Sequence, residues 1–325
     1  MARAGISAIA FVAFSLIFSA GALAHFSSDG DPRFYTILHI TPDDPPFTGT
    51  VSDMWLSIYN ATSGEPIVGL DVLHERVVHM FVVSRDTETF AHIHAEDRVN
   101  GTEYAGQGMF AFNYTFPREG VYAVVVDFTY GGTTVVKKFE LYALNDASSS
   151  YPAAGSDPVI DFSNRRSVSG YEIELTVPER IEVGKEAEMS LHVEDADGPV
   201  RDLGQYLGSE AHVLFLRDDL KYNSHTHAYR PSHALHFGRM AQLYYGPDVP
   251  IRHTFQQPGT YSAFVQFERG GEVVTSKFWV KVEDSAYSAT LLYGSYAAII
   301  IFAVVLFRRE IFGLVARGKG RGPSR

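Results

Sequence analysis

Two stretches of the chain decide its organisation: residues 79–94 read HMFVVSRDTETFAHIH, and residues 212–227 read HVLFLRDDLKYNSHTH. Only four of the 16 aligned positions are identical, and these hold three histidines and one aspartate. The apolar neighbours differ freely, as in Met80 against Val213. The offsets of the histidines have therefore been kept while their surroundings changed. The identical residues are His79, Asp86, His92 and His94 in the first stretch, and His212, Asp219, His225 and His227 in the second.

Matching offsets on both sides of these stretches indicate a duplication of a whole domain. Residues 35–42 (YTILHITP) align with residues 171–178 (YEIELTVP), and FPREGVY at 116–122 aligns with FQQPGTY at 255–261. In each copy a Gly-Gly pair follows the glycine of the second motif by 11 residues. We therefore expect two copies of one domain.

The domain boundaries follow from composition. A segment rich in Ser, Pro, Ala, Gly and Asp, at residues 146–158, is typical of a linker. It separates a first repeat over residues 25–145 from a second repeat over residues 159–285.

Both repeats have the pattern of β-sheet domains. Runs of β-branched and aromatic residues alternate with clusters of turn formers, and no helical periodicity precedes the apolar C-terminal segment. The sequence predicts an all-β fold, two tandem antiparallel β-sandwiches followed by one transmembrane helix. The expected strands are 51–59, 77–83, 122–128, 133–142, 171–177, 212–216, 261–267 and 273–282.

The two ends predict the compartment. A short basic start, an apolar run and a small-x-small site make residues 1–24 a signal peptide, with an uncleaved anchor as the alternative. Residues 286–307 contain no charged side chain and have the length of a membrane-spanning helix. The basic tail 308–325 is expected on the cytoplasmic side. We therefore predict a single-pass cell-membrane protein with its repeats outside.

Charge and cysteine content exclude several classes. A net charge of −11, with basic residues concentrated in the tail, argues against nucleic-acid binding. The chain has no cysteine, which excludes a blue-copper centre and any thiolate zinc site. No Ser-His-Asp, paired-carboxylate or phosphate-loop pattern is present, which favours a binding protein over an enzyme.

The spacing of the three histidines suits one face of a hairpin. If strands 77–84 and 89–94 are joined by a four-residue loop, His79 lies directly opposite His94. His92 shares the face of His94, because strand side chains alternate. Opposed residues have Cβ atoms about 5 Å apart and diagonal ones about 7–8 Å, so three rings can converge on one ion. His212, His225 and His227 give the same construction, with Asp86 and Asp219 as turn residues.

All-imidazole ligation predicts copper as the bound metal, with zinc possible. The alternatives are histidines kept only for packing in a shared fold, or one functional site beside a degenerate copy. A weaker accessory set, found in the longer second repeat, consists of His233, His236 and Met240.

Cleavage after Ala24 makes His25 the first residue of the mature chain. A terminal histidine can chelate copper through its amino group and ring together, as a histidine brace. The alternative is a terminus that begins with histidine by coincidence.

The string HMFVVSRDTETFAHIH, followed by FPREGVYAVVVDF and a Gly-Gly turn, resembles exported cupredoxin-like or immunoglobulin-like domains of the YtkA type. The resemblance implies an extracytoplasmic β-sandwich that handles copper, with His79, His92, His94 and their counterparts as ligands. A terminal histidine with H-x-H is also similar in plan to the copper-binding B subunit of ammonia and methane monooxygenases. The sequence around His92 does not match that family, so the enzyme is not carried over.

Three functions remain open at this stage. The first is a membrane-anchored metal-binding protein, for copper above other metals, in delivery, buffering or sensing, with a membrane or cell-surface protein as partner. The second is a surface adhesion or spacer protein. The third is a copper oxidase or monooxygenase component that uses His25 as a brace.

Overall fold

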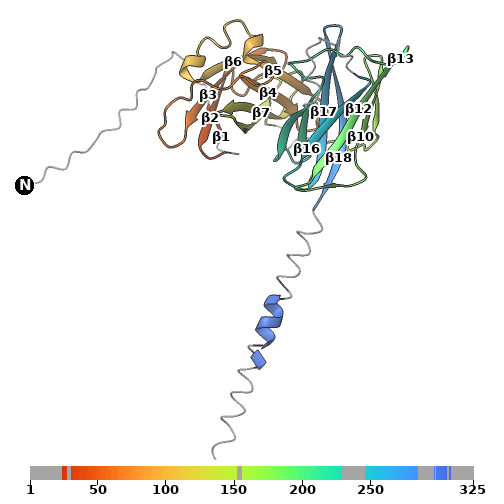
Figure 1. The fold of residues 1–325 in the computed structure, drawn as a ribbon. Helices are drawn as coiled ribbons and strands as arrows, with labels where there is room; N and C mark the ends of the chain where they lie inside the picture. The colour runs from red at the N-terminus through yellow and green to blue at the C-terminus, as the bar shows by residue number, and fades with distance from the viewer. Residues whose placement is uncertain are drawn as a thin grey trace, which may run out of the picture. The chain divides into compact units, whose positions relative to one another are not determined.

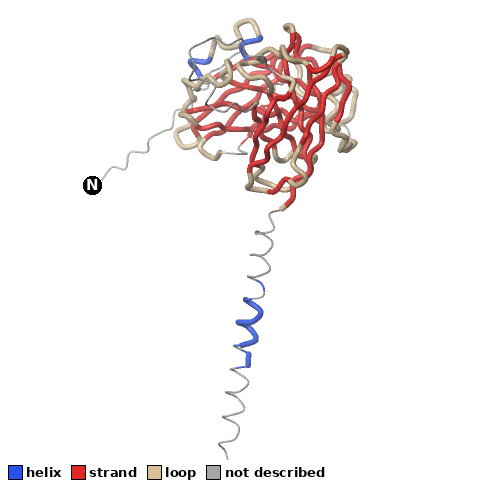
Figure 2. The backbone as a smooth tube through the Cα atoms, turned by 45° about the vertical axis from the view of Figure 1, so that its right-hand side comes forward, coloured by secondary structure: helices blue, strands red, loops and turns tan. Residues whose placement is uncertain are grey.

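The computed structural model describes residues 24–27, 31–151, 156–228, 246–284, 296, 298–305 and 307–308. Described residues up to Ile160 form most of one compact unit, and those from Asp161 form most of another. Strands dominate both units (Figures 1 and 2).

The first repeat contains two four-stranded antiparallel sheets. One has the order β1-β2-β3-β6, and its strands are β1 (Ala24–Ser27), β2 (Phe34–Thr41), β3 (Val51–Asn60) and β6 (Met109–Thr115). The other has the order β5-β4-β7-β8, and its strands are β5 (Phe90–His94), β4 (Val78–Ser84), β7 (Gly120–Tyr130) and β8 (Thr133–Ala143). Two short 3-10 helices, η1 (Ala95–Asp97) and η2 (Ala105–Gln107), lie between β5 and β6.

The second repeat has two five-stranded sheets. The first contains β9 (Arg165–Val168), β10 (Tyr171–Thr176), β12 (Glu186–Asp195), β13 (Gly198–Pro199) and β16 (Asp248–Thr254). The second has the order β11-β18-β17-β14-β15, with β11 (Ile181–Glu182), β18 (Glu272–Glu283), β17 (Gly259–Arg269), β14 (His212–Arg217) and β15 (Asn223–His227). The prediction of antiparallel sheets is confirmed, although β11 pairs with β18 in parallel.

Side-chain alternation explains why each repeat is a sandwich. In β2 buried and half-buried positions alternate strictly, as expected for a strand with one face on a core. The core of the first repeat takes residues from both of its sheets, for example Leu38, Leu56, Val82 and Val124. The second repeat has a separate core of the same kind. All eight predicted strands are present, with ends within a few residues of the expected ones.

The shared F-x-x-x-G-x-Y motif is a matched turn into a central strand. Gly120 begins β7 and Gly259 begins β17. The Tyr122 hydroxyl donates to the Arg118 carbonyl at 2.9 Å, and Tyr261 donates to Gln257 at the same distance. Such a tyrosine corner is typical of immunoglobulin-like sandwiches.

The Gly-Gly pairs close the next hairpin in each repeat. Gly131 and Gly132 have φ values of 58° and 74°, and Gly270 and Gly271 have 63° and 87°. Positive φ at both central residues is what a tight two-residue hairpin turn requires, and glycine adopts it without strain. The prediction of a hairpin turn here is confirmed.

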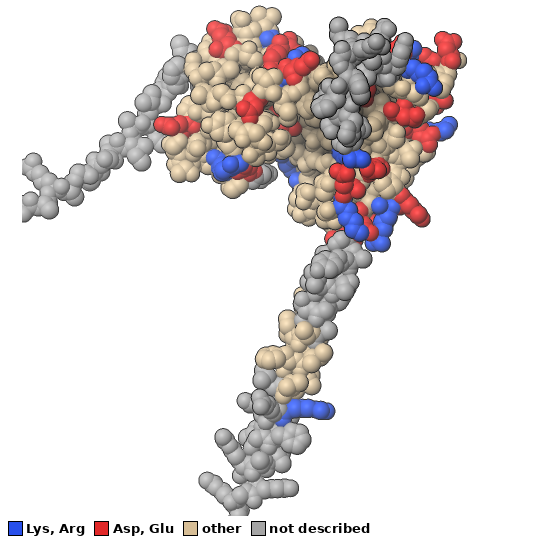
Figure 3. All heavy atoms as spheres, in the orientation of Figure 1, with Lys and Arg blue, Asp and Glu red and all other residues tan. Residues whose placement is uncertain are grey.

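The predicted signal peptide, apart from Ala24, and much of the predicted span 286–307 lie outside the described residues. Within the described part of the chain, no helix combines the length and apolar content that crossing a membrane requires. On the face drawn in Figure 3, acidic and basic side chains are mixed.

Candidate metal centre

The first histidine triad lies on the hairpin of β4 and β5, in the predicted register. His79 pairs directly with His94, and His92 pairs with Phe81. The loop between the strands is closed by Asp86, whose carboxylate accepts from the Ser84 hydroxyl at 2.6 Å and from the Glu88 amide at 3.1 Å. Asp219 accepts from the Lys221 amide at 3.0 Å in the second repeat. Both aspartates are therefore turn residues, as predicted.

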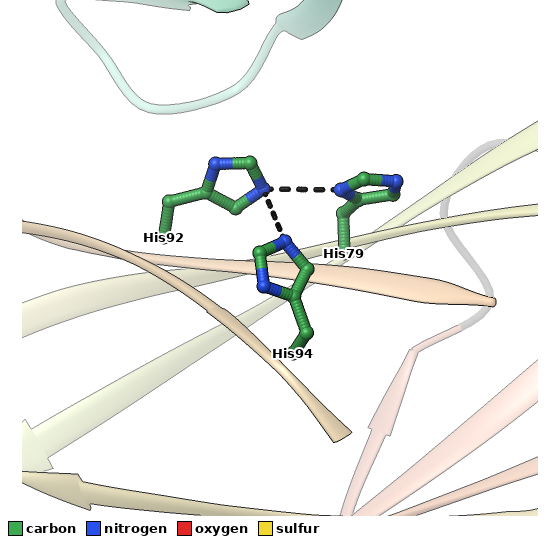
Figure 4. Close-up of side chains that lie close together, drawn as sticks. All are labelled: His79, His92 and His94. Atoms are coloured by element: carbon green, nitrogen blue, oxygen red, sulfur yellow. Dashed lines mark hydrogen bonds between the residues drawn. The ribbon is translucent and has the colours of Figure 1, made fainter. Parts of the chain in front are cut away.

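The three rings of this hairpin converge (Figure 4). His92 lies between the other two: its Nε2 is 3.1 Å from Nδ1 of His79 and 3.0 Å from Nε2 of His94. One nitrogen from each ring lies within 4.8 Å of the others. Nitrogens bound tetrahedrally at about 2 Å from a zinc or copper ion are about 3.3 Å apart, so the observed spacing suits one ion.

The nitrogens on the far side of two rings are held by acceptors. Nε2 of His79 is 3.2 Å from the Leu73 carbonyl, and Nδ1 of His94 is 2.8 Å from the Asp97 carboxylate. These oxygens only accept hydrogen bonds, so the two nitrogens carry the protons. The inner nitrogens of His79 and His94 therefore present lone pairs, the tautomer that metal ligation needs.

The centre of the triad brings together nitrogen atoms of three rings. A neutral His92 has one proton at most on Nε2, yet two lone pairs face that atom at about 3 Å. A cation among the three nitrogens would relieve the repulsion between lone pairs. The donor set therefore fits a metal ion that imidazole binds well, such as copper or zinc.

Burial keeps these rings neutral. His79 and His94 are 2% and 3% exposed. Burial lowers the pKa of His79 to about 3. It also lowers the pKa of His94, against the opposing effect of Asp97. Neutral imidazole is the form that binds a metal, so protons compete weakly at pH 7.

The second triad repeats two features of the first. One ring nitrogen from each of His212, His225 and His227 lies within 4.8 Å of the others. Nε2 of His212 is 2.8 Å from the Tyr206 carbonyl, six residues upstream, just as His79 contacts Leu73 six residues upstream. Both triads are thus brought together as the sequence predicted.

Sequence reasoning missed the groups around the triads. Leu73 and Tyr206 act through backbone carbonyls, which carry no sequence signal. Asp97 follows His94 by three residues and could have been noticed as a nearby acid. Asp127 lies on β7 in register with His79, and burial raises its pKa to about 6 against the opposing effect of the His79 ring.

The weaker candidates stay predictions. His25 is in β1, and its backbone pairs with that of Leu38 in β2. The side chain of His25 is not among those described. His233, His236 and Met240 also lie outside them. Met80, next to His79, is a fully buried core residue.

The fold and the two triads define a tandem β-sandwich protein with one histidine cluster in each repeat. The chain belongs to the family described as "Domain of unknown function (DUF8832)", whose profile matches residues 36–144 and 166–284. The two matches coincide with the two repeats and confirm the tandem duplication. A comparison with curated proteins found no match.

Solved structures similar to the chain contain tandem β domains. A chimeric titin Z1Z2 carrying a peptide from decorin is 12% identical, covering 73% of this chain and 91% of that chain, with a TM-score of 0.18. Domains 5–6 of the S-layer protein SbsC are 12% identical, covering 77% and 97%, with a TM-score of 0.21. The FN1–FN3 domains of chicken CNTN1 are 9% identical, covering 77% and 75%, with a TM-score of 0.20. Likeness at this level carries no argument about function.

Proposed function

We propose that this protein is an exported, membrane-anchored metal-binding protein that delivers, buffers or senses copper outside the cell. The observation that carries the proposal is the first triad, in which Nε2 of His92 lies 3.1 Å from Nδ1 of His79 and 3.0 Å from Nε2 of His94. The same cluster recurs in the second repeat. Packing alone gives no reason to keep three imidazoles together while the neighbouring apolar residues differ.

Copper is the metal proposed, ahead of zinc. Imidazole suits both ions, and copper(II) has the higher intrinsic affinity for such donors. The resemblance of the hairpin sequences to YtkA-type domains also supports copper. The anchor and export proposals rest on residues 286–307 and 1–24, and the partner proposed is another protein at the membrane or cell surface.

Metal content tests this proposal. The full-length chain, purified in detergent and loaded with copper(II) or zinc, is expected to retain close to two ions per molecule after desalting. His92→Ala with His94→Ala should remove one ion, and adding His225→Ala with His227→Ala should remove the other. His192→Ala is the control, because His192 bonds Asp248 and Glu194 outside both triads.

The proposal would be overturned if the chain retained far less than one ion, or if all four triad substitutions left the amount of bound metal unchanged.

Mass spectrometry of the mature N-terminus tests the third function, a copper oxidase or monooxygenase component that uses His25 as a brace. A chain that does not begin at His25 cannot form the brace.

A further inference from the structure

One ring of the first triad is bonded to a carboxylate. In the first repeat Nδ1 of His94 donates to the Asp97 carboxylate at 2.8 Å. The backbone amide of His94 donates to the same oxygen, Oδ2, at 3.1 Å. Asp97 is thus tied to both the ring and the main chain of one candidate ligand.

The position of Asp97 is fixed by the element that carries it. Asp97 is the last residue of η1, which begins directly after His94. Oδ1 of Asp97 lies 3.6 Å from Arg76, so its two oxygens have separate contacts. The Arg98 amide donates to the Ala95 carbonyl at 3.2 Å and closes this turn. The carboxylate is held in place before any ion binds.

The second repeat has no acidic residue at the position that corresponds to Asp97. The residue three positions after His227 is Arg230, where the first repeat has Asp97. No Asp or Glu occurs between His227 and Asp248, whereas Glu96, Asp97 and Glu103 follow His94 closely. The carbonyl contact, in contrast, is present in both repeats.

We infer that Asp97 is a positioning residue that tightens metal binding at the first triad. The inference rests on the proposed function. By accepting the Nδ1 proton, Asp97 holds His94 in the tautomer with its Nε2 lone pair toward the centre. Its charge also makes that lone pair more basic. Removing a carboxylate in this role typically lowers metal affinity by about 10- to 100-fold.

Two single-site proteins separate the sites. The full-length chain with His225→Ala and His227→Ala retains the first triad, and the chain with His92→Ala and His94→Ala retains the second. Competition with a chelator measures Kd for copper(II) and for zinc in each.

Substitutions at Asp97 then test the residue itself. In the first-site protein, Asp97→Asn should raise Kd by about 10- to 100-fold, and Asp97→Glu should recover part of the loss. Asp86→Asn is the matched control, because it removes a carboxylate from the turn of the same hairpin without contact to the rings. Melting temperatures of the metal-free proteins show whether each variant folds.

The imidazole nitrogen resonances of the metal-free protein give a readout that a purely structural role would not move. His94 should be protonated at Nδ1 in the parent protein, and should populate the other tautomer in Asp97→Asn. An unchanged Kd in a folded Asp97→Asn protein overturns the inference and leaves the metal-binding proposal standing. Loss of binding at both sites of the parent chain overturns the proposed function instead.

Discussion

At the scale of single residues, the surroundings of a histidine in this chain decide its protonation. His253 stacks on Phe215, with ring centroids 4.9 Å apart, and lies edge-on to Phe255 at 4.6 Å. Burial lowers its pKa to about 4. His192 bonds Asp248 at 2.6 Å, and this hydrogen bond raises its pKa. The pKa of one histidine is therefore lowered and that of the other is raised.

His253 should make the second repeat sensitive to acid. Its folded pKa of about 4 lies below the unfolded value of about 6.5, so the unfolded chain takes up the proton first. The stability it contributes is present above pH 6.5 and is lost as pH falls toward 4. Between pH 7 and pH 4.5 this loss is about 2 kcal/mol. His253→Phe should remove that share of the loss, measured as the free energy of unfolding in urea at both pH values.

His192 provides a control of opposite sign. Its raised pKa means that its stabilising effect is present at low pH and is lost as pH rises through the folded pKa. His192→Gln should therefore leave the acid sensitivity in place. Equal acid sensitivity in His253→Phe and the parent protein would contradict the assignment to His253.

At the scale of elements, the tyrosine corner is the contact that both repeats share most closely. Tyr122 is fully buried and Tyr261 is 3% exposed, and each bonds a carbonyl four residues upstream. Each tyrosine also packs edge-on or tilted against a phenylalanine, Phe116 or Phe255. The corner thus fixes how the chain enters the central strand of each repeat.

Removing either corner hydroxyl should destabilise its own repeat. Tyr122→Phe and Tyr261→Phe keep the ring but leave a carbonyl without its donor, at a cost of about 1–2 kcal/mol each. The free energy of unfolding in urea measures the cost. Tyr130→Phe, on a 40% exposed tyrosine of the same strand β7, is the control and should cost much less. A corner variant as stable as this control would contradict the prediction.

The β4–β5 hairpin was predictable from the sequence because all its information is local. Alternation fixes which side chains share a face, and the length of the loop at Asp86 fixes that His79 opposes His94. The partners of the rings were not predictable. The Leu73 carbonyl contacts His79 from a separate loop. Asp127 lies opposite His79 on the neighbouring strand β7. Such contacts depend on packing between segments that no local pattern encodes.

At the scale of the whole molecule, the duplication gives each repeat the sheets and the apolar core of a complete domain. Each repeat has two sheets and its own buried cluster of apolar residues. The profile matches end and restart between the repeats, at residues 144 and 166. A domain with its own two-layer core is expected to fold without its neighbour.

Residues 159–284 expressed alone should therefore unfold cooperatively in urea. With copper(II) at about 100 times its Kd, the free energy of unfolding should rise by about 2.7 kcal/mol, because only the folded fragment assembles His212, His225 and His227. The same fragment with His225→Ala and His227→Ala is the control, and it should fold without gaining stability from copper. A fragment that shows no cooperative transition would mean that the second repeat needs the first in order to fold. A folded fragment that copper leaves unchanged would instead make its triad a feature of packing, with metal binding confined to the first repeat.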